Sequence, residues 1–306
     1  MNVRDWALIT FTILAQMSVG AFLVLGVVRY YATRKAGVEE ADRLSNRALL
    51  AIFPVLGLGL IASLFHLGNP LTAYTAVTNI GSSWLSREIL FGATFAVLAA
   101  IFALMQWRKI ASFAVRNVIE WITALVGLGL VYSMSNVYML PTQPAWNTLA
   151  TPVSFFTTTF LLGALAMGVA FVINYTYVQR KEPGCAEAQC TLLRDVMRWI
   201  VLASVVLLGV ELVVLPIYLA SLAAGPAAAV QSAQLMVGPF IWALVLRVVL
   251  AFLGAGVFAV FLYQNALSPG QEKMLGNLAY AAFALVLVAE VLGRFLFYAT
   301  HVRIGI

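Results

Sequence analysis

Long apolar stretches alternate with short polar connections along the whole chain of 306 residues. The stretches are continuously hydrophobic, which is typical of membrane helices and not of a membrane barrel. A bilayer core of about 30 Å needs about 20 apolar residues per spanning helix. We therefore predict an all-α integral membrane protein, one bundle of eight transmembrane helices over residues 1–306. The spans are expected at about Trp6–Val28, Ala48–Leu67, Ile89–Trp107, Val118–Leu140, Val153–Tyr177, Trp199–Ala220, Phe240–Tyr263 and Leu278–Tyr298.

Composition and charge support this class and give an orientation. Hydrophobic residues make up 63% of the chain and charged residues 10%, a balance that soluble domains do not have. Thirteen of the 18 Lys and Arg residues lie in or beside the connections after spans one, three, five and seven. The positive-inside rule places these connections in the cytoplasm and both termini on the periplasmic side of the cell inner membrane. This bias explains the net charge of +6 without a nucleic-acid partner.

The ends of the second and third spans form the most informative corner of the sequence. His66 ends the second apolar stretch, and Gly68, Asn69 and Pro70 stop the helix after it. Glu88 opens the third stretch. An imidazole and a carboxylate are therefore expected at neighbouring helix ends on the outer side.

Other polar residues of the spans are expected in the same outer half of the bilayer. Glu290, Arg294 and His301 fall on one helix stripe by their spacing, and Tyr132 and Asn136 share another face. Glu211 is expected at mid-depth or beyond, and Glu120 alone on the inner side. The groups assigned to the surroundings of the site are Tyr132, Asn136, Arg247, Glu290, Arg294 and His301.

A histidine and a carboxylate near a membrane surface suit quinol oxidation, which releases two protons with two electrons. A histidine has a pKa near ambient pH, so His66 is predicted to accept the first proton and to bind the quinol. Glu88 is predicted to orient the imidazole or to pass the proton outward. The membrane supplies the quinone pool, and apolar helices leave a side entrance for the quinone tail.

Structural interpretations of the same residues remain open. His66 can be a helix cap or an interfacial residue, and Glu88 can stabilise the N-terminus of its helix through the helix dipole. Glu290 and Arg294 can form a structural ion pair, or Glu290 can be the ion-pair partner of Arg247. His301 can lie in the headgroup region.

Metal and haem sites are not expected on this protein. A bis-histidine haem needs two histidines at matching depth, whereas His66 and His301 are the only two and both lie near helix ends. Cys185 and Cys190 fall in a predicted cytoplasmic connection without other ligands, and no cysteine run for an iron–sulfur cluster is present. Dinucleotide and P-loop fingerprints are also absent from the sequence.

The sequence resembles the membrane anchor subunits of the dimethyl sulfoxide reductase (DmsC-like) family. The resemblance covers the whole chain and is strongest at Ser63–Pro70, Ser83–Ile89, Thr151–Phe156 and Ala289–Tyr298, followed by His301. It implies a subunit of a complex iron–sulfur molybdoenzyme of anaerobic respiration, which oxidises menaquinol near the periplasmic face. Electrons would pass to an iron–sulfur subunit with four clusters and then to a catalytic subunit with a molybdenum bis-pterin, both periplasmic.

In this family the quinol-site histidine falls on His66 and the acidic residue on Glu88. Asn69 and Arg87 depart from the residues expected at their positions, which puts quinol affinity or partner contacts in question. Because quinol oxidation and substrate reduction would lie on one side, little charge separation across the membrane is expected. The alternatives are a quinone-reducing anchor of a dehydrogenase or polysulfide-reductase-like complex, and a small-solute or proton transporter. A transporter would need a polar track to the cytoplasmic side, which spans two, three and eight do not show.

Overall fold

The computed structural model describes residues 3–66, 78–181, 186–267 and 272–305, and these ranges are helical with no strand among them. Its α-helices are α1 (Val3–Ala36), α2 (Val38–His66), α3 (Trp84–Arg108), α4 (Phe113–Tyr138), α5 (Ala150–Lys181), α6 (Ala186–Ala223), α7 (Ala227–Val237), α8 (Ile241–Ala251), α9 (Phe258–Leu267) and α10 (Glu272–Ala299). A short π-helix, η2 (Phe252–Val257), joins α8 to α9. The prediction of an all-α protein is confirmed for the described residues.

Within the described residues, seven segments are long and apolar enough to cross a membrane. They are Asp5–Ala36, Trp84–Arg108, Phe113–Tyr138, Ala150–Tyr177, Thr191–Ala223, Ile241–Leu267 and Lys273–Ala299. The remaining expected span, Ala48–Leu67, falls largely within α2, which is not among these seven segments. A total of eight spans therefore stays a prediction.

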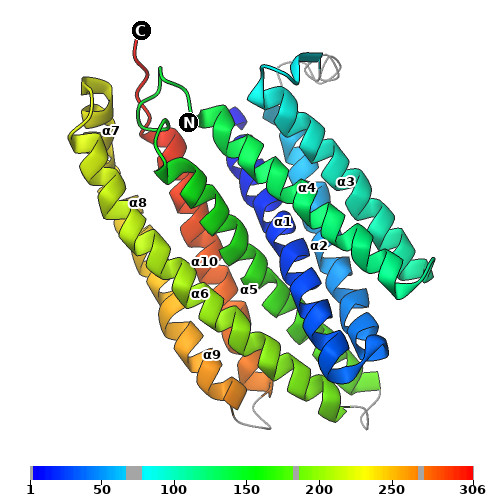
Figure 1. Ribbon diagram of the computed structural model, residues 1–306. Helices are drawn as coiled ribbons and strands as arrows, with labels where there is room; N and C mark the ends of the chain where they lie inside the picture. The colour runs from blue at the N-terminus through cyan, green and yellow to red at the C-terminus, as the bar shows by residue number, and fades with distance from the viewer. Residues whose placement is uncertain (1–2, 67–77, 182–185, 268–271, 306) are drawn as a thin grey trace.

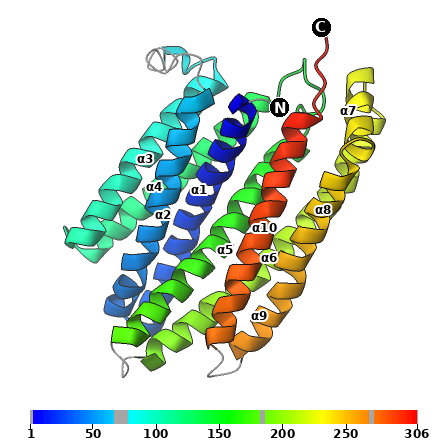
Figure 2. The same ribbon diagram turned by 180° about the vertical axis from the view of Figure 1, so that it is seen from behind.

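The long helices lie side by side in one elongated bundle (Figures 1 and 2). Helices α2 to α4 form one side and α6, α8 and α9 the other, with α1, α5 and α10 between them. Both ends of the described chain lie at one end of the bundle, together with α7 and the connection from α4 to α5 (Figure 1). We call this the terminal end and the other the opposite end. The side of the membrane that each end faces stays a prediction.

Helices α1 and α5 form the centre of the bundle. In each of them 72% of the most apolar window is buried, against 17% in α3, so most of that window of α3 lies exposed on the outside of the bundle. The two central helices cross where two glycines meet, because a Cβ atom on Gly20 would lie only 2.9 Å from the Cα atom of Gly163. Small residues at such a crossing let membrane helices approach closely.

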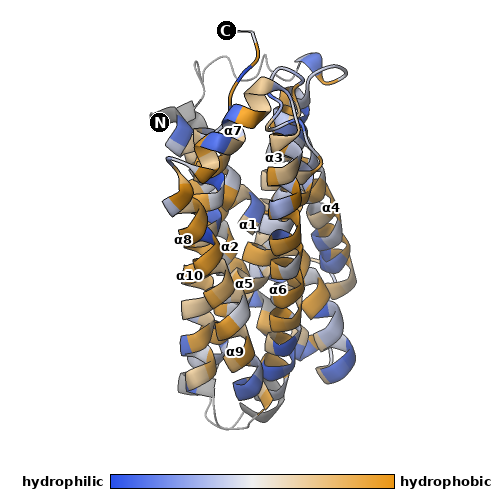
Figure 3. Ribbon diagram, turned by 90° about the vertical axis from the view of Figure 1, so that its left-hand side faces the viewer, coloured by the Kyte–Doolittle hydropathy of each residue, from blue (hydrophilic) through white to orange (hydrophobic). Residues whose placement is uncertain are grey.

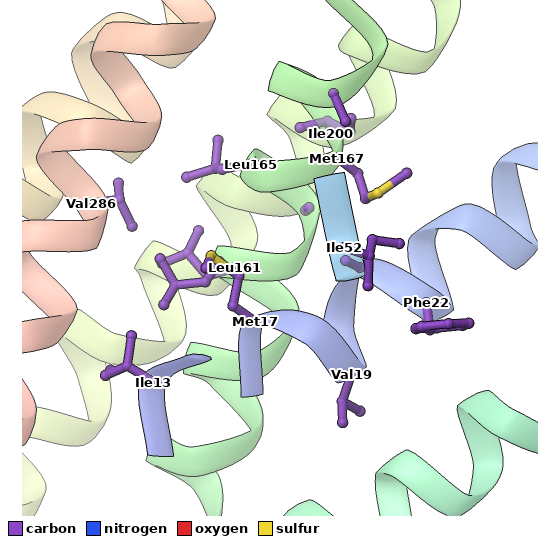
Figure 4. Close-up of a cluster of buried hydrophobic side chains, with 14 of the residues drawn as sticks. Ile13, Met17, Val19, Phe22, Ile52, Leu161, Leu165, Met167, Ile200 and Val286 are labelled. Carbon is purple, nitrogen blue, oxygen red and sulfur yellow. The ribbon is translucent and has the colours of Figure 1, made fainter. Parts of the chain in front are cut away.

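The middle of the bundle is apolar. Figure 4 shows Met17, Val19 and Phe22 of α1 packed among aliphatic side chains of neighbouring helices. The polar residues Gln16 and Arg29 flank this stretch of α1, and 13 residues of helix correspond to about 20 Å. Figure 3 shows the same pattern for the whole bundle, with hydrophobic residues through the middle and hydrophilic residues gathered toward the two ends.

A charged cluster is buried near the opposite end, which corrects the expectation of Glu120 as the single titratable group there. Arg29 and Glu120 are fully buried and approach each other to 3.1 Å, and the Arg29 guanidinium lies 4.7 Å from the Phe113 ring centroid. The expectation is wrong because α1 continues as a helix to Ala36 and carries Arg29 into the bundle, where the sequence had suggested a connection.

Asp42 of α2 joins α3 and α4 beside this cluster. Its carboxylate accepts hydrogen bonds from Lys109 Nζ and Gln106 Nε2, each at 2.6 Å, and from Arg116 at 3.3 Å. Burial raises the pKa of Asp42, but these hydrogen bonds and the charges of Lys109 and Arg116 together bring the pKa below its usual value. Asp42 therefore links α2 to the neighbouring ends of α3 and α4 as an ionised carboxylate.

Candidate functional site

Glu88 is placed by the first turns of α3 at the terminal end. Ser83 caps the helix through its side chain. Arg87 is half-buried and donates to the carbonyls of Ile80 (2.8 Å) and Gly81 (2.7 Å), which connects the preceding turn to the helix. The next residue turns inward, and only 9% of Glu88 remains exposed. Its position fits the prediction of a carboxyl group buried near a helix end.

Two buried phenols lie within electrostatic range of Glu88. The hydroxyls of Tyr138 and Tyr298 lie 2.6 Å apart and share a hydrogen bond between α4 and α10. The Glu88 carboxylate interacts electrostatically with both phenols, and in the described part of the protein it has no hydrogen-bond partner. Glu88 therefore keeps its acceptor capacity for a ligand or for a residue outside the described ranges.

An aromatic wall covers the phenol pair toward the terminal end. The Trp146 ring stacks on Phe297 at 5.0 Å and on His301 at 4.3 Å between centroids. His301 is exposed and donates from Nδ1 to the Tyr298 carbonyl at 2.7 Å. The expected stripe of His301 with Glu290 and Arg294 is wrong, because α10 ends at Ala299 and the backbone then leaves the helical path.

Arg294 lies on the inner side of the same wall. Its guanidinium donates to Gln16 Oε1 at 2.9 Å and stands 3.8 Å from the Phe155 ring centroid. The alternative of an ion pair between Glu290 and Arg294 is not observed among the described residues. Arg294 donates to Gln16 instead, and Glu290 accepts from Thr158. Arg294 still interacts electrostatically with both Tyr298 and Glu290.

A cavity of about 80 Å³ lies on the other side of Arg294, between α5, α6, α8 and α10. Arg247 Nη2 lies 3.3 Å from Glu211 Oε1 there, and the Thr158 hydroxyl donates to Glu290 Oε2 at 2.6 Å. Sequence reasoning noted Glu211 only for its depth and missed Thr158. The polar part of the lining consists of Thr151, Ser154, Thr157, Thr158, Glu211, Tyr218, Arg247, Glu290 and Arg294.

The remaining predicted residues lie apart from the cavity or outside the description. Tyr132 is 50% exposed and packs edge-to-face against Trp84 at 5.5 Å, and Asn136 donates to the Tyr132 carbonyl at 2.8 Å. His66 is the last residue of α2, which ends at the terminal end (Figure 2), but its side chain lies outside the described residues.

The side chains at the terminal end can donate and accept hydrogen bonds and can exchange protons with a ligand. Carboxyl groups, phenols and guanidinium groups from α3, α4, α6, α8 and α10 meet beneath the terminal end. Among the described residues, no group of three or more His, Cys, Asp or Glu side chains is placed to hold a metal ion. Such a site can bind the hydroxyls of a neutral ring and accept its protons.

Comparison with known proteins gives one family and one fold. The profile of the DMSO reductase anchor subunit (DmsC) family matches residues 1–300. A protein of the anaerobic dimethyl sulfoxide reductase of Haemophilus influenzae is 31% identical over 305 residues, 99% of the present sequence and 97% of that protein. A protein of the anaerobic dimethyl sulfoxide reductase of Escherichia coli is 29% identical over 99% of the present sequence and 96% of its own length.

More distant similarities extend to other oxidoreductases. One protein of the sulfite dehydrogenase of Allochromatium vinosum is 28% identical over 135 residues, which cover 44% of the present sequence and 38% of that protein. The solved structure of the bd oxidase from Geobacillus thermodenitrificans superimposes with a TM-score of 0.66 at 12% identity, over 97% of the present protein and 85% of that one. At this identity the superposition concerns the fold alone.

Proposed function

Since the protein belongs to the DMSO reductase anchor subunit (DmsC) family, we propose that it binds menaquinol beneath the terminal end and oxidises it there. The two electrons pass to an iron–sulfur partner subunit with four clusters, and onward to a catalytic subunit with a molybdenum bis-pterin. Both partners dock on the periplasmic side of the inner membrane. The anchor itself performs the quinol half-reaction.

The main support for this proposal is that Glu88 is buried and interacts electrostatically with the phenol pair. An unpaired carboxylate at this depth is unfavourable by a few kcal/mol, so a functional partner is the expected reason for it. Tyr138 and Tyr298 already share a hydrogen bond with each other, which leaves Glu88 as the acceptor for an incoming hydroxyl. His66 ends α2 at the same end of the bundle.

The proposed mechanism uses the residues at this corner in order. The ring enters from the bilayer beside α3, whose surface is mostly exposed to lipid. His66 accepts the proton of one hydroxyl as the first electron leaves, and Glu88 accepts the other proton or orients the imidazole. The aromatic wall of Trp146 and Phe297 separates this chemistry from the aqueous phase.

The charge distribution supports an outward-facing terminal end. Basic residues gather at the opposite end, as with Arg34, Arg108, Lys109 and Arg198, and the positive-inside rule makes that end cytoplasmic. The proton-releasing site and the docking surface for the partners then lie on the periplasmic side.

Two alternatives remain on specific grounds. The partial similarity to a sulfite dehydrogenase protein is compatible with the reverse flow, in which an external dehydrogenase or a polysulfide-reductase-like partner exchanges electrons with quinone. A transporter is disfavoured, because about 20 Å of apolar packing separates Gln16 from Arg29 along α1.

The test is quinol oxidation by the intact complex carrying His66→Ala or Glu88→Gln. Each variant should slow turnover with a menaquinol analogue by about 100-fold, since it removes a proton acceptor. Reduction of dimethyl sulfoxide with a dye that donates directly to the partner subunits should be unchanged, which reports assembly. Glu39→Gln, on the solvated start of α2, is the matched control. Normal quinol turnover in both site variants would refute the assignment.

A further inference from the structure

The cavity lined by Arg294 contains two carboxyl groups that the proposed quinol site does not use. We call that site, around His66 and Glu88, the quinol corner. Glu211 comes from α6 and Glu290 from α10, and both are largely buried. Glu290 Oε2 accepts the Thr158 hydroxyl, whereas Glu290 Oε1 is buried without a donor. Glu211 approaches Glu290 closely enough for a hydrogen bond between the two side chains.

A hydrogen bond between two carboxyl groups requires a proton. Ionised carboxylates are acceptors only, so contact between Glu211 and Glu290 becomes favourable when one of them is protonated. Two like charges in contact within a membrane repel each other strongly, and carboxyl pairs elsewhere relieve this by sharing one proton. The unpartnered Oε1 atom of Glu290 is the acceptor that such a proton would occupy.

The surrounding charges suit a pair with one negative charge. Arg247 of α8 contacts Glu211 at 3.3 Å, and Arg294 of α10 interacts with Glu290 without pairing to it. Tyr218 of α6 is the remaining titratable group in the lining, and its hydroxyl donates to the Ala145 carbonyl at 2.9 Å. Helix α5 contributes hydroxyls and no titratable group to the lining.

The cavity has room for water beside the pair. A water molecule needs roughly 10–15 Å³ of such volume, so about 80 Å³ can hold about five molecules. Ser154 and Thr157 supply further hydrogen-bond partners on the side toward the terminal end. A protonated carboxyl pair in contact with a few waters can exchange its proton.

We propose that Glu211 and Glu290 form a proton-sharing pair in a hydrated cavity, and that this pair takes up and releases one proton in each quinol oxidation. This inference rests on the proposed function. Breaking both O–H bonds of one quinol yields two protons and two electrons, and the electrons go to the iron–sulfur partner. One proton leaves through His66, whose imidazole Glu88 orients. The other converts the singly protonated pair to two neutral carboxyl groups and then passes to water at the terminal end.

Arg294 couples the pair to the quinol corner. Its guanidinium interacts electrostatically with Tyr138, Tyr298 and Glu290, and it lines the cavity together with Glu290. A change of charge beside Glu88 therefore alters the field at Glu290 through a shared neighbour. The pair and the corner are distinct sites with separate readouts.

The experiment compares Glu211→Gln, Glu290→Gln and the double variant in the intact complex, with Glu39→Gln as control. Infrared spectra of the resting complex should contain a deuterium-sensitive band of a protonated carboxyl that either single substitution removes. Each single variant should slow quinol oxidation at least about tenfold, and the double variant should match the single ones, because one pair is lost in every case. Dye-linked dimethyl sulfoxide reduction checks assembly.

The outcomes separate this inference from the proposed function. A carboxyl band that persists in both single variants, or additive losses in the double variant, would overturn the shared-proton pair. If the pair variants oxidise quinol normally while Glu88→Gln is inactive, the pair has no role in turnover and the quinol corner still holds. If Glu88→Gln is also fully active, the proposed function itself fails.

Discussion

Adjacent hydroxyls on α5 have different partners, although they look equivalent in the sequence. Thr159 donates to the carbonyl of Phe155 within its own helix at 2.8 Å, whereas Thr158 donates across the bundle to Glu290 at 2.6 Å. Successive residues of a helix point about 100° apart, so only one of them faces α10. The direction of each hydroxyl depends on how α5 is rotated against its neighbours.

Thr158→Val should therefore lower the stability of the protein more than Thr159→Val. The first change leaves a second oxygen of Glu290 without a donor, at about 1–3 kcal/mol for a buried acceptor. The second removes only a local bond to the helix backbone, which contributes little. Thermal unfolding of the detergent-purified complex and quinol turnover would both be measured. Equal effects of the two substitutions would contradict the assigned partners.

Residue-scale prediction from the sequence succeeds where depth alone decides the environment. Glu88 and Glu290 could be placed inside the membrane because each lies within or next to an apolar run. Tyr132 could not be assigned to the exposed face, nor Arg294 to Gln16, because spacing along one helix does not fix the rotation of that helix. The quinol role of His66 stays a prediction, since its side chain lies outside the described residues.

At the scale of helices, the close crossing of α1 and α5 determines how the helices on either side of these two are placed. Of two glycines on α2, a Cβ atom on Gly57 would meet nothing within 4 Å, whereas one on Gly59 would lie 3.2 Å from Leu14 of α1. A Cβ atom on Gly163 would instead meet backbone atoms of Gly20 and Ala21. Which glycine supports a close approach follows from the helix pairing, and periodicity does not reveal that pairing.

Gly163→Ala should destabilise the bundle by about 1–3 kcal/mol, because the added methyl group meets rigid backbone and must separate α1 from α5. Gly209→Ala on α6 is the matched control, since a Cβ atom there meets nothing within 4 Å. The free energy of unfolding in detergent would be compared for the two variants. A stabilised Gly163→Ala protein would contradict the close crossing.

Helix boundaries were predictable only where the apolar runs mark them. The expected first span stops near Val28, but α1 continues to Ala36. Its last turns are held by Tyr31, which donates to Asp195 of α6 at 3.0 Å, and by an ion pair between Lys35 and the same carboxylate. Contacts between residues so far apart in sequence cannot be inferred from local patterns. The π-helical turn of η2 inside the seventh expected span was likewise not predicted.

At the scale of the whole molecule, the two ends of the bundle carry different groups. The terminal end carries both ends of the described chain and the proposed quinol corner, and the opposite end carries the charged cluster around Asp42. Successive long helices run in opposite directions between these two ends (Figure 1). The orientation in the membrane is open to direct measurement.

Thiol labelling would test this orientation. Helix α6 begins at Ala186 at the opposite end and contains the native Cys190 in its first turns, whereas the native Cys185 lies outside the described residues. In cells with a permeabilised outer membrane, an impermeant maleimide should label an added Ile304→Cys and leave the native cysteines unlabelled until the inner membrane is opened. Labelling of the native cysteines from outside, with protection of position 304, would invert the topology and move the quinol corner to the cytoplasm.

The apolar layer between Gln16 and Arg29 has a consequence for energy conservation. Hydrocarbon side chains filling that layer make it an electrical insulator, and the groups proposed to react with quinol all lie on one side of it. Protons and electrons that start and finish on the same face move no net current through the insulator. We therefore expect respiration through this subunit to run without adding to the membrane voltage, so that its energetic value lies in recycling the quinone pool.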